Sequence, residues 1–145
     1  GYRVFVVSNQ PGVARGLYPE SALEPVVRRL EELLESEDAA LDGYYYCPHH
    51  PEGKVRGYSV ECRCRKPLPG LIEAACREHA LDPLRSWMIG VESDDIEAGR
   101  RAGCRTVKIG RGHQPAAREN GRLVRQLTAP DLSRAADLIL ARAEP

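Results

Sequence analysis

The sequence is poor in large aromatic side chains and has no excess charge of either sign. One Phe, one Trp and six Tyr make up 6% of the 145 residues. The 21 basic residues balance 21 acidic ones. Partners such as nucleic acids and membrane surfaces usually require a basic excess, so the balance argues against both. No apolar run approaches the roughly 20 residues of a membrane span, and no segment resembles a signal peptide. We therefore expect a cytoplasmic protein, with a monomer as the default.

The length and composition predict a single globular domain over residues 1–145. Hydrophobic residues make up 42% and charged residues 29% of the chain, as in ordinary soluble domains. The chain opens at Gly1 and enters the apolar run Tyr2–Val7 almost at once. Because the first residues of a domain are usually loose, we expect an N-terminal truncation.

Apolar periodicity predicts alternating strands and helices. The expected strands are Tyr2–Val7, Tyr44–Cys47, Ser86–Val91 and Thr106–Ile109, and the expected helices are Ser21–Ser36, Leu71–Ala80, Ile96–Ala102 and Asp131–Ala143. Ser21 and Glu24 have capping-box spacing, Asp131 or Ser133 would cap the last helix, and 110–130 reads as a polar loop. The alternation predicts an α/β fold with a mainly parallel sheet, whose ligands bind at the carboxyl ends of the strands.

A Cys/His-rich loop indicates a zinc site. Cys47 and His49 form a C-x-H pair, and Cys62 and Cys64 form a C-x-C pair twelve residues further on. Three thiolates and one imidazole suit tetrahedral zinc of the closed, structural kind. The loop is too polar to pack by itself, so a metal would supply its folding energy. Free thiols on the loop are the alternative.

The remaining cysteines and a neighbouring histidine have other expected roles. His50 is a spare imidazole that would support a ligand or face the substrate. Cys76 and Cys104 fall in a helix and at a strand start, where small core residues are common.

Polar residues at predicted strand ends are candidates for phosphate binding. Ser8 and Asn9 follow the first strand, where side-chain and backbone groups could hold phosphate oxygens. Arg15 could bind phosphate in the bidentate manner that arginine favours. Arg65 and Lys66 follow the Cys/His loop, and a lysine there could neutralise charge during phosphoryl transfer. Capping of a turn by Ser8 and a solvated Arg15 are the alternatives.

Taken together, these motifs resemble those of the haloacid dehalogenase (HAD) superfamily. The run from Ser8 to Gly16 resembles its second motif, 47–67 resembles a zinc loop running into the third-motif lysine, and 95–103 resembles the segment after the fourth motif. The closest likeness is to the branch of heptose 1,7-bisphosphate phosphatases and histidinol-phosphate phosphatases. The resemblance implies a Rossmann-like three-layer sandwich with an inserted zinc loop at about 47–66.

The resemblance also implies a reaction and a set of site residues. The reaction would be Mg²⁺-dependent hydrolysis of a sugar phosphate through an aspartyl-phosphate, with the 7-phosphate of D-glycero-D-manno-heptose 1,7-bisphosphate as the expected substrate group. Ser8 would bind the transferring phosphate and Asn9 would line the site. Arg15, Arg65 and Lys66 would recognise the substrate, with Lys66 also the third-motif lysine. Zinc would be bound by Cys47, His49, Cys62 and Cys64.

Two departures from the family pattern bear on catalysis. The first motif, D-x-D-G, supplies the nucleophilic and acid/base aspartates, and no D-x-D occurs in this sequence. We therefore expect the nucleophile to lie upstream, the first-motif strand to be missing from the sheet, and the 145-residue chain to be inactive. In the fourth motif Val91 stands where the family has a magnesium-binding aspartate. Glu92 or Asp95 is the remaining candidate for Mg²⁺, although Asp95 could instead cap the helix that begins near Ile96.

Three function classes remain open on the sequence. The first is a phosphatase, acting on heptose bisphosphate or, alternatively, on histidinol phosphate. The second is an inactive, zinc-stabilised domain that binds sugar phosphate, which Val91 favours. The third, a zinc-ribbon nucleic-acid-binding module, is disfavoured by zero net charge.

Overall fold

The computed structural model describes residues 1–110, 117–119, 122–124 and 126–142. The chain divides into two compact units. Unit 1 comprises residues 1–65 and 70–79, and unit 2 comprises residues 66–69 and 80–145. The single domain expected from the sequence stays a prediction.

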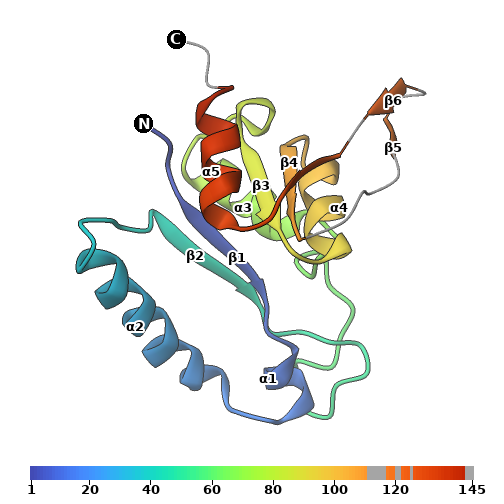
Figure 1. The fold of residues 1–145 in the computed structure, drawn as a ribbon. Helices are drawn as coiled ribbons and strands as arrows, with labels where there is room; N and C mark the ends of the chain where they lie inside the picture. The colour runs from blue at the N-terminus through green and yellow to red at the C-terminus, as the bar shows by residue number, and fades with distance from the viewer. Residues whose placement is uncertain (111–116, 120–121, 125, 143–145) are drawn as a thin grey trace. The chain divides into compact units, whose positions relative to one another are not determined.

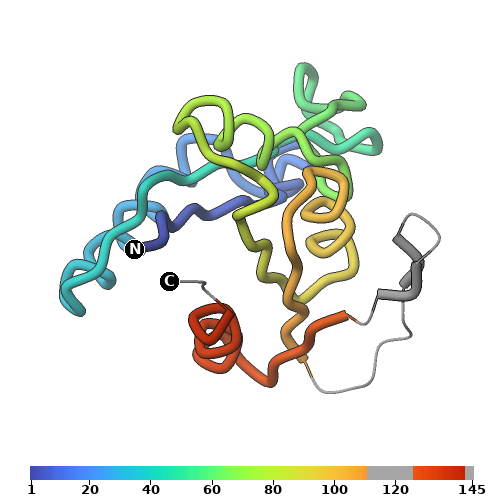
Figure 2. The backbone as a smooth tube through the Cα atoms, turned by 90° about the horizontal axis from the view of Figure 1, so that it is seen from above, coloured from blue at the N-terminus to red at the C-terminus, as the bar shows by residue number. Residues whose placement is uncertain are grey.

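Unit 1 is built on two parallel strands. Its elements are β1 (Phe5–Asn9), α1 (Pro11–Arg15), the 3₁₀ turn η1 (Glu20–Ala22), α2 (Leu23–Glu35), β2 (Gly43–Cys47) and α3 (Gly70–Glu78). The two strands lie side by side in both views (Figures 1 and 2), and Asn9 stands opposite Cys47 in their register. Helix α3 packs on both strands. The carboxyl ends of β1 and β2, which carry predicted site residues, therefore share one edge.

The helix starts of unit 1 differ from the sequence prediction. The capping box of Ser21 and Glu24 does not form, because η1 occupies this turn and α2 begins at Leu23 without a side-chain cap. The turn expected after the first strand is instead the short helix α1, with Pro11 at its first position, where the missing N–H costs no hydrogen bond.

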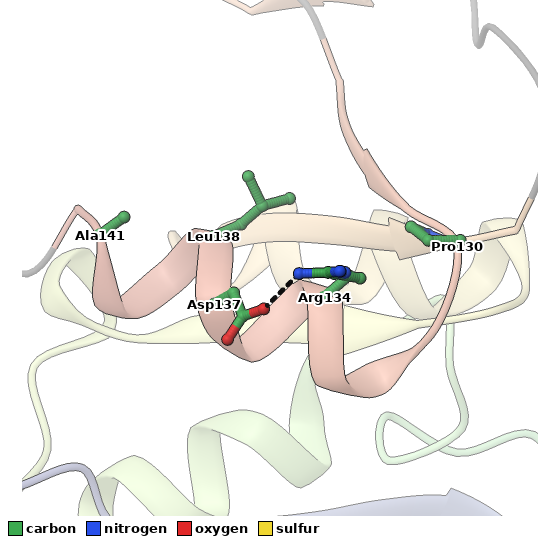
Figure 3. A pocket seen from close by; sticks show the side chains of 5 residues that line it. All are labelled: Pro130, Arg134, Asp137, Leu138 and Ala141. Atoms are coloured by element: carbon green, nitrogen blue, oxygen red, sulfur yellow. Dashed lines mark hydrogen bonds and ion pairs between the residues drawn. The ribbon is translucent and has the colours of Figure 1, made fainter.

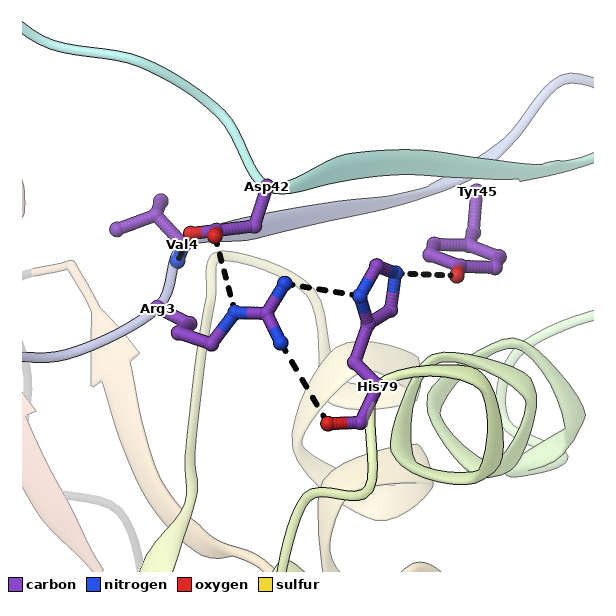
Figure 4. A network of polar contacts seen from close by, with 5 residues as sticks. All are labelled: Arg3, Val4, Asp42, Tyr45 and His79. Atoms are coloured by element: carbon purple, nitrogen blue, oxygen red, sulfur yellow. Dashed lines mark hydrogen bonds and ion pairs between the residues drawn. The ribbon is translucent and has the colours of Figure 1, made fainter.

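A polar network fastens the start of β1 to β2 and α3 (Figure 4). The carboxylate of Asp42 accepts hydrogen bonds from Arg3 Nε at 2.9 Å and from the Val4 N–H at 2.7 Å. Arg3 Nη2 lies 2.9 Å from His79 Nδ1, and His79 Nε2 lies 3.1 Å from the Tyr45 hydroxyl. Since a guanidinium only donates, Nδ1 accepts and Nε2 carries the ring proton.

Unit 2 is a three-stranded parallel sheet with helices packed on it. Its elements are the 3₁₀ turn η2 (Pro83–Arg85), β3 (Trp87–Gly90), α4 (Ser93–Arg101), β4 (Arg105–Ile109), β5 (Ala117–Glu119), β6 (Arg122–Val124), β7 (Leu127–Ala129) and α5 (Leu132–Leu140). The strand order is β3-β4-β7, and α5 packs on all three strands. Val107 and Ala129 of the strands and Ala135 and Ile139 of α5 form the buried core between the sheet and this helix. Asp131 caps α5 by accepting from the Arg134 N–H.

The α/β fold with parallel strands is confirmed, and one loop prediction is wrong. In the described part of the chain, β1–β2 and β3-β4-β7 form separate sheets, in agreement with the expected missing strand. The expected loop at 110–130 contains β7 and the antiparallel pair β5–β6, while its residues 111–116, 120–121 and 125 lie outside the described residues. The alternating apolar residues of β7 were missed because the strand is only three residues long.

Over the described residues, no helix combines the length and the apolar character that crossing a bilayer requires.

The Asp42 network predicts an acid-sensitive contribution to the stability of unit 1. The Val4 N–H and the Arg3 guanidinium lower the pKa of Asp42 below its usual value. A lowered folded-state pKa stabilises the fold above the unfolded-state pKa, and this contribution is lost as the pH falls through the folded-state pKa. We expect Asp42→Asn to lower the melting temperature at neutral pH and to lose this deficit in acid. Melting curves followed by circular dichroism from neutral pH to about pH 2, well below the ordinary Asp pKa, measure this.

The matched control is Asp38→Asn, which changes an exposed aspartate of the same unit. Equal deficits for Asp42→Asn at neutral and acid pH would contradict the prediction.

Candidate functional site

Four side chains of unit 1 converge on one point, as the C-x-H and C-x-C spacing predicts. Cys47 ends β2, and His49, Cys62 and Cys64 come from the loop that follows. Their ligand atoms all lie within 4.8 Å of one another. Cys64 Sγ lies 3.1 Å from Cys47 Sγ and 3.3 Å from Cys62 Sγ, and His49 Nδ1 lies 3.4 Å from Cys64 Sγ. In the part of the chain that the structure describes, this is the one His/Cys/Asp/Glu group placed to hold a metal ion.

The donor set fits a tetrahedral zinc ion. Zinc–sulfur bonds of about 2.3 Å place two sulfur ligands about 3.8 Å apart, so small outward movements of the thiols would admit the ion. Burial, and then the hydrogen bond with Cys64, raise the pKa of the Cys47 thiol well above its usual value. A raised pKa disfavours the thiolate that zinc requires. A bound cation offsets this effect, because a thiol that coordinates a metal is deprotonated. With four protein ligands, zinc here would organise the chain and leave no open position for catalysis.

The zinc loop is fastened to the carboxyl end of β1. Asn9 pairs with Cys47, and the Gln10 N–H donates to the Cys47 carbonyl at 2.8 Å. The amides of Lys54 and Val55 both donate to the Ala14 carbonyl of α1, at 2.7 and 2.9 Å. Helix α1 and the metal loop therefore hold each other in place through the backbone.

Two arginines that the sequence assigns to the substrate lie beside this loop. Arg15 ends α1 and is exposed, with Nη2 3.3 Å from His50 Nε2. Arg65 is half-buried, and its Nη1 lies 3.5 Å from the His49 carbonyl oxygen. Ser8 and Asn9, both half-buried, end β1. Unit 1 therefore carries four predicted phosphate contacts together with the zinc cluster.

The sequence reading missed Glu20, which joins η1 to β2 and to the zinc loop. Its carboxylate accepts from the Tyr46 hydroxyl at 3.1 Å and from the Tyr58 hydroxyl at 2.5 Å. The bond to Glu20 is the main cause that raises the pKa of Tyr58, and for Tyr46 burial comes first. No spacing rule links residues 20, 46 and 58, so the sequence carries no signal for this contact.

Lys66 and Asp95 form an ion pair within unit 2. Lys66 Nζ lies 2.7 Å from Asp95 Oδ1, and the side chains are 10% and 15% exposed. Asp95 Oδ2 accepts from the N–H groups of Val91 and Glu92, at 3.1 and 3.0 Å. A Cβ at Gly90 would collide with the Asp95 side chain, so this glycine makes room for it. Asp95 thus joins the third-motif lysine to the first turn of α4.

The same contacts bear on the expected magnesium site. Both oxygens of Asp95 are engaged, the Val91 side chain offers no ligand atom, and Glu92 is exposed at the N-cap of α4. Magnesium is usually held by one or two carboxylates, with waters and substrate phosphates completing its octahedron. Among the described residues of the fourth motif no three His, Cys, Asp or Glu side chains converge on one point, and a Mg²⁺ role for Asp95 or Glu92 stays a prediction.

Unit 2 also has a hollow of about 420 Å³ along α5 (Figure 3). It is lined by Pro130, Arg134, Asp137, Leu138 and Ala141. Arg134 and Asp137 neutralise each other in an ion pair of 3.1 Å. None of the predicted site residues lines this hollow.

A family model and curated relatives match the chain. A model described as HAD-hydrolase-like matches residues 63–135. The D-glycero-beta-D-manno-heptose-1,7-bisphosphate 7-phosphatase of Salmonella typhi is 37% identical over 119 residues, which cover 82% of this chain and 63% of that protein. The enzyme of the same name from Haemophilus influenzae is 41% identical over 99 residues, or 68% of this chain and 53% of its own length. The chain thus spans less than two thirds of these relatives.

Solved structures resemble the chain as well. A D,D-heptose 1,7-bisphosphate phosphatase from B. bronchiseptica, complexed with magnesium and phosphate, gives a TM-score of 0.78 at 28% identity and covers 97% of this chain and 75% of that chain. A putative HAD-like phosphatase from Mesorhizobium loti gives 0.80 at 36% identity, covering 97% and 66%. The resemblance stated from the motifs is thereby confirmed.

Removing one ligand of the cluster should release the metal. We expect Cys62→Ser to lower the zinc content, measured by elemental analysis, from one ion per chain to a small fraction, because three ligands cannot close the tetrahedron. Cys76→Ser, on α3 and outside the cluster, should keep its zinc. Full zinc content in Cys62→Ser would sink the assignment of the site.

Breaking the ion pair between Lys66 and Asp95 should lower the stability of the protein. Asp95→Asn removes the carboxylate that faces Lys66, and we expect a loss of about 3 kcal/mol in unfolding free energy, because removing one partner of a buried pair costs roughly 3–5 kcal/mol. Urea unfolding followed by Trp87 fluorescence measures this. Glu97→Gln, which breaks an exposed pair with Arg101, is the control and should cost at most about 0.5 kcal/mol. Equal losses in both variants would refute a structural role for Asp95.

Proposed function

This chain belongs to the HAD-hydrolase-like family, and on that premise we propose that it forms the substrate-binding part of a sugar-phosphate phosphatase. The reaction is hydrolysis of a phosphate monoester, with the 7-phosphate of D-glycero-D-manno-heptose 1,7-bisphosphate as the preferred group. The nucleophilic aspartate comes from outside these 145 residues, because the sequence has no D-x-D motif.

One observation carries the proposal: the predicted phosphate contacts gather on the edge that the zinc loop holds. Asn9 is in register with Cys47, the cluster residue that ends β2. Arg15 lies against His50 of the loop. A phosphate at this edge would meet hydroxyl, amide and guanidinium donors, the groups that best bind phosphate oxygens.

Each residue has a distinct task in this proposal. Ser8 and Asn9 donate to the transferring phosphate, and Arg15 and Arg65 bind the rest of the phosphorylated substrate. Lys66 offsets negative charge that builds up on the transferring group, as fixed cations do in phosphoryl transfer. Asp95 holds Lys66 in place through their ion pair. Zinc, where bound, holds the loop. Magnesium is the expected cofactor of this reaction, and Asp95 or Glu92 would be its ligand in this chain.

The choice among substrates rests on the relatives. Several curated relatives are heptose-1,7-bisphosphate 7-phosphatases, which supports heptose bisphosphate over histidinol phosphate. The alternative of another class, an inactive domain that binds sugar phosphate, is favoured by Val91 at the usual magnesium position. The cytoplasmic location and the monomeric state stay predictions.

An assay of phosphate release distinguishes the phosphatase hypothesis from the hypothesis of an inactive binding domain. The 145-residue chain is expected to release no phosphate from heptose 1,7-bisphosphate, because it has no aspartyl nucleophile. A version that includes any sequence encoded directly upstream is expected to release it, and faster than from histidinol phosphate. Release by the 145-residue chain alone would refute the missing-nucleophile account. No release from either substrate by the longer, folded protein would favour the binding domain.

A binding measurement tests the proposed phosphate contacts of unit 1 and does not require turnover. We expect Arg15→Gln to weaken the binding of heptose 1,7-bisphosphate to the 145-residue chain about ten-fold or more, because a hydrogen bond to a charged group contributes about 1.5–3 kcal/mol. Isothermal titration calorimetry measures the dissociation constant. Arg28→Gln, on the exposed face of α2, should bind as the wild type does. Unchanged affinity in Arg15→Gln would remove Arg15 from the site.

A further inference from the structure

Gln10 and Tyr18 are two polar side chains of unit 1 to which the proposed function gives no role. Gln10 follows Asn9 directly and is the N-cap residue of α1. Its N–H donates to the Cys47 carbonyl at 2.8 Å, and its carbonyl accepts from the Val13 N–H at 3.3 Å. Both backbone groups are thus used, and the side chain starts from a fixed point beside Ser8.

The Gln10 amide is held by three hydroxyl groups. Its Nε2 lies 2.9 Å from Ser8 Oγ and 3.4 Å from the Tyr44 hydroxyl, while its Oε1 accepts from the Tyr18 hydroxyl at 2.8 Å. The nitrogen carries two protons and faces two hydroxyl oxygens, and the oxygen faces a third hydroxyl, which can donate. This arrangement uses the donors and the acceptor of the amide together.

The orientation of the amide determines what Ser8 can do. A serine oxygen that accepts a hydrogen bond from Gln10 keeps its own proton for donation to another acceptor. In the opposite orientation, Gln10 Oε1 would accept that proton and Ser8 would be a poorer donor. In the structure the Tyr18 hydroxyl lies at the oxygen end of the amide and donates to it, and this contact favours the first orientation.

The position of Tyr18 depends on a glycine. A Cβ at Gly12 would collide with the Tyr18 ring, so the ring packs directly on the backbone of α1. Tyr18 is itself half-buried, and the close approach brings its hydroxyl to Gln10. Helix α1 thus supplies the surface against which the tyrosine is held.

We propose that Tyr18 and Gln10 are positioning residues that direct the Ser8 hydroxyl proton toward a bound phosphate. The chain of hydrogen bonds runs from Tyr18 to Gln10 to Ser8, and the last proton is donated to a phosphate oxygen. This inference rests on the proposed function, in which Ser8 contacts the phosphate.

The first experiment tests the hydrogen-bond chain without any ligand. In nitrogen–proton NMR spectra, the side-chain amide signals of Gln10 should shift in Ser8→Ala and in Tyr18→Phe. They should stay in place in Tyr2→Phe, a matched loss of an exposed hydroxyl in the same unit. Gln10 signals that do not respond to Ser8→Ala or Tyr18→Phe would overturn the inference.

The second experiment is a double-mutant cycle with inorganic phosphate as the ligand of the 145-residue chain. Ser8→Ala should weaken phosphate binding about ten-fold, as expected for loss of a hydrogen bond to a charged group. Tyr18→Phe and Gln10→Met should each weaken it about two- to five-fold in the wild type, and neither should weaken it further in the Ser8→Ala background. Tyr2→Phe should bind phosphate as the wild type does.

The outcomes separate the two claims. If Ser8→Ala weakens binding but Tyr18→Phe and Gln10→Met do not, the inference fails while the proposed phosphate site stands. Equal losses from Tyr18→Phe with and without Ser8 would mean a general structural role and would also overturn it. If Ser8→Ala leaves phosphate affinity unchanged, the proposed role of Ser8 fails, and the positioning role fails with it.

Discussion

The four-residue cluster at the end of β2 is the constraint on which the candidate site of unit 1 depends. The segment from Pro48 to Pro69 contains no helix or strand, so regular backbone hydrogen bonding does not hold it. Its fixed points in unit 1 include the cluster of Cys47, His49, Cys62 and Cys64, the two amides that donate to Ala14, and the Tyr58–Glu20 contact. A loop that lacks a core of its own obtains its folding energy from such a cluster when a metal closes it. Because α1 is hydrogen-bonded to the same loop, the cluster also determines where Arg15 and the Gln10 backbone lie.

In unit 2, the contacts of the Asp95 carboxylate are structural ones. Asp95 neutralises the nearly buried Lys66 and accepts from the first amides of the fourth motif. A carboxylate with these contacts has little capacity left for a cation, and the valine at position 91 adds none. Val91 supplies no side-chain ligand, and the Asp95 carboxylate is engaged with Lys66 and two amides. In this motif the carboxylate therefore balances the charge of Lys66.

Sequence patterns predicted the features whose residues lie close together in the chain or repeat regularly. The parallel α/β fold followed from alternating apolar runs, the zinc cluster from the C-x-H and C-x-C pairs, and the family from its motifs. The contacts of Glu20 were not predictable, because they join segments that are distant in the sequence. The Tyr18–Gln10 contact spans only eight residues, but it depends on helix α1, where the sequence predicted a turn. The capping box of Ser21 and Glu24 was wrong for a similar reason: Glu20 is fixed by two distant tyrosines, and η1 takes the turn that the box would need.

The central claim is that the loop, organised by a metal, holds helix α1, which carries Arg15 of the proposed phosphate site. Hydrogen exchange tests this claim most directly. The Lys54 and Val55 amides donate to Ala14, and the Ala14 amide donates to the Pro48 carbonyl. Exchange at these three amides should be slow in the zinc-bound chain and faster by about ten-fold or more after chelation, because local opening exposes them once the loop is released. Exchange at the amides of β4 in unit 2 serves as the internal reference. Unchanged exchange at all three amides after complete removal of the metal would contradict the claim.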